Sequence, residues 1–209
     1  MPEIGSEAEK HHLIAGVLCL NFANTLYGHG KTPIHEYLFG YRDLVIWSRK
    51  VGILADTDDE SLLREASRRP AEATAVFQRA IALRETIHRV FKALAHDERP
   101  KANDLATLNS ARNEAFSASY IAAAADGFAI NWRDRTALDR MLWPIVLSAA
   151  ELLISADLDR VRQCGGCDWL FVDKSRNHLR RWCSMSVCGN RAKARRFMER
   201  RRQLALRRR

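Results

Sequence analysis

The sequence has no run of about 18 or more uninterrupted apolar residues, the minimum for a membrane-spanning helix, and its N-terminus is polar and acidic. A secretory signal would instead start with basic and then apolar residues. We therefore expect a soluble, cytoplasmic protein without a membrane partner. The chain also lacks a glycine-rich phosphate loop, an HExxH pair and a nucleophile elbow, so an enzyme is the weakest functional alternative.

Cysteine is scarce, with five residues in a chain of 209. Without an export signal, these five are not expected to form a disulfide framework, because cytosolic thiols are kept reduced and clustered cysteines more often bind metal. The sequence also has no internal repeat and no glycine- or serine-rich linker. Its 47% of hydrophobic residues can fill the core of one ordinary domain and a small appended one.

Acidic residues are nearly missing from the last part of the chain. Residues 160–209 contain 16 Lys and Arg and 3 Asp and Glu, a net charge of +13, whereas residues 1–159 contain 18 and 22, a net charge of −4, and the two sum to +9. Such a basic segment is either a solvated tail that aids solubility or a surface for an anionic partner. We place a domain boundary at this change, between a helical body (1–159) and a C-terminal module (160–209).

Apolar residues recur at three- and four-residue intervals through most of the helical body, as in amphipathic helices. The longest such segment begins at Pro70, and Asp58 and Thr136 are candidate N-caps. Residues 119–132 instead contain two short β-compatible runs around Asp126-Gly127, which predicts a hairpin. The predicted fold is mainly α (α+β), with further helices at about 14–27, 36–52, 58–68, 101–117 and 136–157.

The strongest metal signal is the spacing of four cysteines. Cys164 and Cys167 enclose two glycines, Cys183 follows after 15 residues, and Cys188 follows after 4 more. Two short-spaced pairs at this separation are typical of a structural zinc site with four thiolate ligands and no open position. The glycines allow a tight turn whose backbone N–H groups reach sulfur. We predict one structural zinc ion per chain, with redox or iron–sulfur chemistry as the alternative.

Two further residues of metal-binding type lie outside this set. His178 precedes Cys183 by five residues, but four sulfurs already complete a tetrahedral shell, so we expect His178 at the surface. The fifth cysteine, Cys19, stands between two leucines and is expected to fill the core as a small hydrophobic residue.

Residues 160–200 closely resemble the CGNR zinc-finger family, named for the Cys-Gly-Asn-Arg that stands here at 188–191. The resemblance implies four thiolate ligands on a compact treble-clef-like finger, and a DNA-binding role. The matching features before this motif are the pair Cys164 and Cys167, the aromatic and apolar run 169–172, Asp173, and the Ser-Arg-Asn run 175–177.

Residues 18–25 and the Leu83-Arg84-Glu85 step resemble the ABATE domain, which commonly precedes this finger. The resemblance implies a helical unit with a few strands, proposed to sense a small molecule in stress-linked transcription control. The family usually has Asp where this chain has Asn21.

Three polar residues stand in apolar helical stripes of the body: Asn24, Thr25 and Arg84. Burying such groups is costly unless they are hydrogen-bonded, so they need partners. Either they bridge neighbouring helices, or they border a pocket for an unknown small molecule, and we name them as candidate ligand-binding residues.

The chain ends in a strongly basic predicted helix. Lys and Arg can follow a phosphate backbone, and Arg can also read guanine edges. Arg191 has a second interpretation, because it could offset the negative charge of a four-thiolate centre. Phe197 is expected to pack inward against the zinc site, and the Arg-rich end from Glu199 is expected to fray unless it is bound. The candidate nucleic-acid contacts are Arg191, Lys193, Arg195, Arg196 and Arg200.

Together these features predict a DNA-binding transcription regulator with a small-molecule-sensing helical domain, which could act as a homodimer on a two-fold site. The alternative is an RNA-binding or ribosome-associated zinc protein. RNA recognition usually uses exposed aromatic residues for base stacking, whereas we expect the aromatic residues of the module to lie in its small core, which favours DNA.

Overall fold

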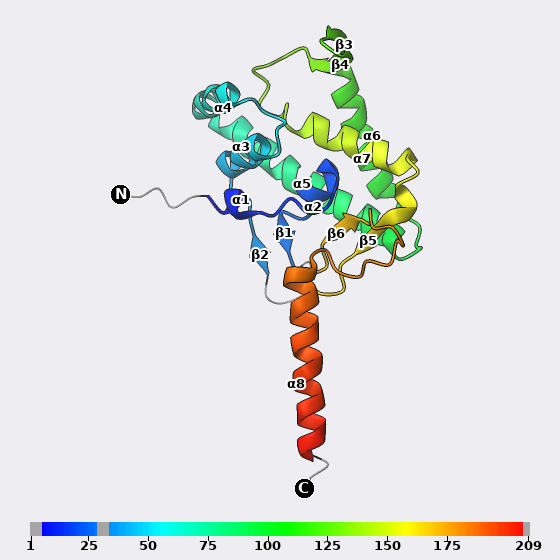
Figure 1. Ribbon diagram of the computed structural model, residues 1–209. Coiled ribbons are helices and arrows are strands. Elements are labelled where there is room, and N and C mark those ends of the chain that lie inside the picture. Colours follow the sequence, from blue (N-terminus) through cyan, green and yellow to red (C-terminus); the bar gives the residue numbers. More distant parts are fainter. Residues whose placement is uncertain (1–5, 29–33, 207–209) are drawn as a thin grey trace, which may run out of the picture.

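The computed structural model describes residues 6–28 and 34–206, apart from the side chains of residues 56, 57 and 204–206 (Figure 1). The helices are α1 (Glu7–Lys10), α2 (Leu18–Ala23), α3 (Tyr41–Lys50), α4 (Asp56–Arg68), α5 (Pro70–Ala95), α6 (Ala102–Ser117), α7 (Leu142–Ile154) and α8 (Asn190–Leu206). Antiparallel pairs join β1 (Leu26–Tyr27) to β2 (His35–Glu36), β3 (Ser119–Ala124) to β4 (Gly127–Trp132), and β5 (Val161–Gln163) to β6 (Leu170–Val172). The predicted mainly α fold is confirmed.

Helix α5 is the centre of the body and packs against α2, α3, α4 and α6. Pro70 occupies its first turn, as predicted, where the missing N–H costs nothing. The almost wholly apolar α7 packs against α2 and α6, and Trp143 of α7 meets Trp132 at a ring distance of 5.2 Å. Trp47 of α3 is fully buried in the same core. No helix within residues 6–28 and 34–206 is both long and apolar enough to cross a membrane.

The helix predicted at 14–27 is wrong in length. Gly16 has a positive φ of 84°, so the helix starts only at Leu18, and it ends at Ala23 because Asn24 leaves the helical path. The chain then forms β1, which pairs with β2. Apolar spacing over 14–27 therefore marks a buried segment rather than a continuous helix.

Both predicted N-caps are also wrong. Asp58 lies inside α4, where its carboxylate pairs with Arg135 at 3.3 Å and Arg140 at 3.0 Å. Thr136 lies in a turn, and its N–H and hydroxyl both donate to Asp134 at 2.7 Å, so α7 begins only at Leu142. The range predicted at 36–52 likewise shortens to α3, whose N-cap is Gly40.

The hairpin predicted around Asp126-Gly127 is confirmed. Strands β3 and β4 pair in register from Ser119 with Trp132 to Ala124 with Gly127, whose φ of 127° suits a glycine. The hairpin lies at the end of the molecule opposite α8 (Figure 1).

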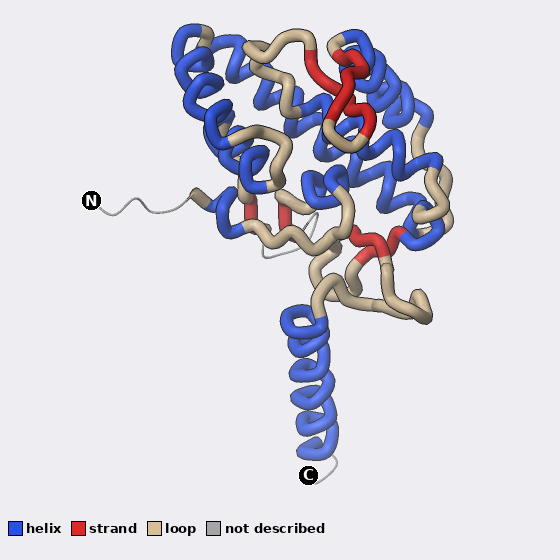
Figure 2. Tube along the Cα trace, turned by 45° about the horizontal axis from the view of Figure 1, so that its top comes forward, coloured by secondary structure: helices blue, strands red, loops and turns tan. Residues whose placement is uncertain are grey.

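The C-terminal module packs directly onto the helical body, because Val161, Leu170 and Val172 belong to the same buried apolar cluster as α5 and α7. Helix α8, in contrast, projects away from every other element in two views (Figures 1 and 2). The side chains of residues 193–203 are all exposed. The Arg-rich end that we expected to fray is helical to Leu206, and residues 207–209 lie outside the described part.

Candidate metal centre

Four buried cysteines come together at the base of α8. Cys164 and Cys167 lie in the turn between β5 and β6, and Cys183 and Cys188 lie just before α8, with Cys188 in the π turn Met185–Gly189. All four Sγ atoms lie within 4.8 Å of one another. A hairpin turn and a helix start that face each other are the arrangement expected of a treble-clef-like finger.

The sulfur geometry fits a tetrahedral zinc ion. The Sγ of Cys183 lies 3.4 Å from that of Cys167 and 3.7 Å from that of Cys188. A Zn–S bond of about 2.3 Å requires sulfurs about 3.8 Å apart at the corners of a tetrahedron. Four thiolates fill all four positions, so the zinc is structural, and no position remains for a catalytic water.

The two glycines between the first two cysteines are closely packed. A Cβ on Gly165 would lie 3.0 Å from the Trp182 ring, and one on Gly166 would lie 3.2 Å from the Cβ of Cys188. The N–H of Gly166 also donates to the Cys164 sulfur at 3.4 Å. Hydrogen bonds from Cys167 and Cys183 lower the pKa of the Cys164 thiol.

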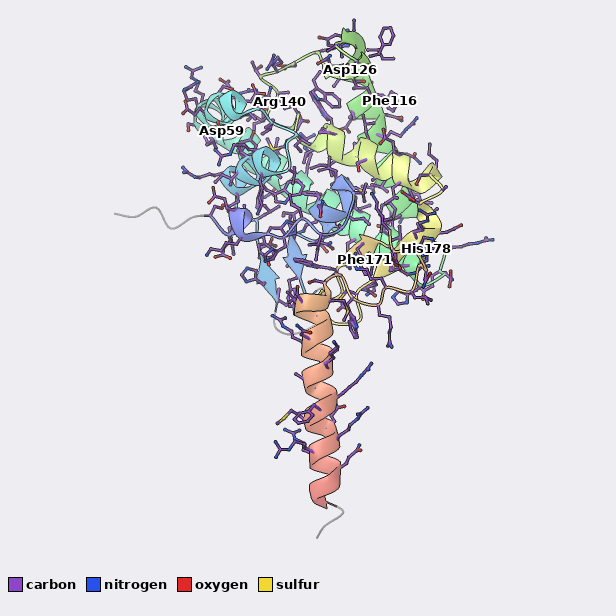
Figure 3. All side chains as sticks on the ribbon, in the orientation of Figure 1. Asp59, Phe116, Asp126, Arg140, Phe171 and His178 are labelled. Carbon is purple, nitrogen blue, oxygen red and sulfur yellow. The ribbon has the colours of Figure 1, made fainter. Side chains whose placement is uncertain are left out.

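A buried carboxylate shapes the loop between the two cysteine pairs. The Oδ1 of Asp173 accepts from the N–H of Ser175 at 2.9 Å, and its Oδ2 accepts from the N–H of Arg180 at 2.8 Å. These bonds lower the pKa of Asp173 against the raising effect of its burial, which keeps the carboxylate ionised. The Arg180 guanidinium lies 4.9 Å from the centre of the Phe171 ring. Figure 3 labels Phe171, which belongs to β6, near the base of α8.

Residues 16–156 match the family model ABATE, described as "Putative stress-induced transcription regulator", and residues 160–201 match the CGNR zinc finger. The first match covers more than half of the chain. The chain belongs to the ABATE family. The comparison with curated proteins finds no match.

The helical body supplies the outer wall of the zinc site. Ile14, Tyr27 and Tyr37 pack on the cluster formed by the four cysteines and two aromatic side chains of the module. The indole N–H of Trp169 donates to the carbonyl of Leu26 at 3.1 Å. The sequence did not predict this role for Tyr27 and Tyr37, because contacts between distant segments leave no local pattern.

The three candidate ligand-binding residues of the ABATE region all have protein partners. Asn24 bonds to the backbone of Leu170, and the hydroxyl of Thr25 donates to the carbonyl of Phe22 at 2.8 Å. Arg84 is 3% exposed and forms a two-point ion pair with Glu36 at 2.7 and 2.9 Å. This is the bridging role that we weighed against a ligand pocket. A ligand role for the three stays a prediction.

Asn21, where the family usually has Asp, accepts a hydrogen bond from the N–H of Ala15 at 3.0 Å through its amide oxygen. Aspartate would supply the same acceptor, so this contact does not require a charge. Cys19 is buried away from the metal cluster and His178 is exposed, which confirms both predictions.

The five candidate nucleic-acid residues share one helix, α8, and all are exposed. Arg191, in its first turn, donates to the Tyr27 hydroxyl at 3.3 Å. The prediction for Phe197 is wrong: its side chain is 61% exposed. Tyr27 and Tyr37 already cover the zinc site on the side of the body, and α8 points away from it, so Phe197 has no surface to pack on.

Proposed function

We propose that this ABATE-family chain is a cytoplasmic DNA-binding transcription regulator that holds duplex DNA with α8 and the C-terminal module, and that its body senses a small molecule. The main support is the charge and length of α8 and its separation from the body. A basic helix of 17 residues, about 25 Å long, stands clear of the body, and a major groove about 12 Å wide admits such a helix. All five candidate contacts are exposed on this helix.

The zinc site gives this helix a rigid base, since Cys188 precedes α8 by two positions. The burial of Trp169 and Phe171 supports DNA over RNA, because neither ring is exposed at the outer surface where the bases of a nucleic acid could stack on it. The exposed Phe197 is the feature that favours the RNA alternative. Sequence specificity would need a second copy on a two-fold site, and the predicted homodimer can be checked by sedimentation.

A salt titration of duplex binding by the intact, zinc-loaded protein tests the proposal. We expect about 4 to 7 phosphate contacts and a log–log salt slope of about −4 to −6. The variant Arg195→Gln with Arg196→Gln should flatten the slope by about one or two and weaken binding to all sequences alike. If either arginine reads a base edge, the loss should be larger at the preferred site by about 1–3 kcal/mol.

The matched control replaces two exposed arginines of the body, Arg64 and Arg112, by Gln. It removes the same charge and should leave the slope unchanged. Equal losses in the two variants, or tighter binding to structured RNA than to any duplex DNA, would overturn the proposal. Truncation at Asp159 is a poorer test, because it removes Val161, Leu170 and Val172 from the common core.

A further inference from the structure

A cavity of about 420 Å³ lies where the helical body meets the C-terminal module. The body contributes Tyr27 and Tyr37, and the module contributes Trp169, the thiolate side of the zinc site and Arg191. Its volume is within the range of small-molecule sites and exceeds the roughly 150 Å³ that holds a benzene molecule. The candidate residues Asn24, Thr25 and Arg84 do not line it. We call it the junction cavity.

Three aromatic rings form one corner of the junction cavity. Tyr27 meets Trp169 edge to face with ring centres 6.2 Å apart, and Tyr37 meets Trp169 at a tilt of 50° and 6.4 Å. Trp169 is held in place by its bond to Leu26 and by the ring of His11 at 5.4 Å. Rings set at such angles offer both faces and edges, so a flat aromatic guest can stack on one ring and meet the edge of another.

The polar groups of the junction cavity include one permanent cation and several hydroxyls. Arg191 brings a guanidinium, and Ser184 and Ser186 bring hydroxyls. Among the described residues that line the cavity there is no Asp or Glu. Four thiolates and one Zn²⁺ carry a charge of −2 at one wall of the cavity, so the group of the lining that favours an anion is the guanidinium of Arg191.

We propose that the junction cavity binds a planar aromatic anion of the aromatic carboxylate class, with its ring against Tyr37 and Trp169 and its carboxylate on Arg191. The two-pronged guanidinium matches a carboxylate. Arg191 also lies in the first turn of α8, so a bound carboxylate occupies a side chain that duplex DNA would otherwise use. This regulatory consequence rests on the proposed function, whereas binding itself does not.

The test is a fluorine NMR titration of the intact, zinc-loaded protein with 4-fluorobenzoate, without DNA. We expect saturable binding, and binding at least about ten-fold weaker for the neutral isostere 4-fluorobenzamide. Arg191→Gln should weaken benzoate binding by about ten-fold or more, and Tyr37→Leu should do so while keeping every charge. The matched control Arg200→Gln removes the same charge further along α8 and should bind benzoate like the native protein. Zinc content and circular dichroism are measured for each variant.

Several results would overturn the proposal: no benzoate binding at millimolar concentration, equal binding of acid and amide, or native affinity in both the Arg191 and Tyr37 variants. The link to DNA is measured separately. Benzoate should weaken duplex binding by the native protein but not by Tyr37→Leu, which retains the whole of α8. If the chain binds benzoate but no duplex, the cavity stands and the DNA-binding function fails.

Discussion

Asn24 and Leu170 exchange two hydrogen bonds across 146 positions of sequence: the Asn24 amide N–H donates to the Leu170 carbonyl at 2.8 Å, and the Leu170 N–H donates to the Asn24 amide oxygen at 2.9 Å. The side-chain amide of Asn24 thus gives the backbone of β6 the two hydrogen bonds that a neighbouring strand would otherwise supply. It joins the C-terminal end of α2 to the strand that follows the first cysteine pair. The side chain of Asn24, which we considered as a ligand-binding group, therefore links the helical body to the C-terminal module.

Replacing Asn24 by Ala should lower the free energy of unfolding by about 1–3 kcal/mol, because it leaves a buried N–H and a buried carbonyl without partners. Asn24→Asp should cost more, since a carboxylate would face the Leu170 carbonyl. Urea unfolding measures both. Asn109→Ala, on the exposed side of α6, is the control and should change stability by less than about 0.5 kcal/mol. Equal losses of stability in Asn24→Ala and Asn109→Ala would contradict this linking role of Asn24.

Metal analysis of the purified protein should find about one zinc per chain, and Cys188→Ser should lose it and unfold the module. Cys19→Ser should keep the zinc. Burial raises the pKa of Cys19 to about 12, so its thiol stays protonated near neutral pH. Iodoacetamide should therefore label the four cluster cysteines after zinc removal and spare Cys19 until the body unfolds. Iron in the purified protein, or early labelling of Cys19, would be the contrary result.

We expect the ion pair between Arg84 and Glu36 to stabilise the folded protein. Arg84→Met would leave the partly buried Glu36 carboxylate with the N–H groups of Tyr37 and Leu38 but without the guanidinium, at an expected cost of about 1–3 kcal/mol. Arg84→Met with Glu36→Gln should cost less than the two single changes added together, as a double-mutant cycle in urea would show. Arg68→Met is the control, because the exposed Arg68–Glu65 pair should contribute less than about 1 kcal/mol.

His11 gives the stability of the protein a defined pH dependence. Burial lowers the pKa of His11 to about 3, and its Nδ1 accepts from the Trp47 indole N–H at 3.1 Å. The unfolded chain binds a proton near pH 6.5 that the folded chain does not, so stability is full above pH 6.5 and is lost as the pH falls toward 3. The slope is about 1.4 kcal/mol per pH unit.

Unfolding of the zinc-loaded protein at pH 7.5 and 5.5 checks this expectation. The native protein should lose about 1.4 kcal/mol more between these pH values than His11→Gln, which keeps an acceptor for Trp47 but does not titrate. Equal pH dependence of the two proteins would assign the acid sensitivity to other groups.

The zinc site could be predicted because its information is local: two cysteine pairs, a glycine pair and a helix start all lie within 160–191. The same holds for the Asp126-Gly127 hairpin, whose turn is fixed by two adjacent residues. The partners of Asn24 and Arg84 could not be predicted, since polar residues in an apolar stripe show only that a partner exists.

The failed predictions share another physical cause. Apolar periodicity was interpreted as helix at 14–27, where the buried residues instead pack from a short helix and a strand. Phe197 was placed inward on the assumption that the module has to cover its own core. Because Tyr27 and Tyr37 cover that core from the body, nothing in the sequence of α8 could reveal that its apolar side chains remain exposed.

Helix α8 beyond Ala192 has no buried side chain among residues 193–203, and like charges face each other one turn apart at Arg191 and Arg195 and at Arg196 and Arg200. An unsupported helix of this length is marginal in water, and this repulsion weakens it further. Added salt should then act in two opposite ways, relaxing the repulsion that unwinds the helix while weakening its attraction to phosphate. At low ionic strength, part of the free energy of binding would be spent on winding α8, which should appear as a gain of helical circular dichroism and a negative heat-capacity change on mixing with duplex.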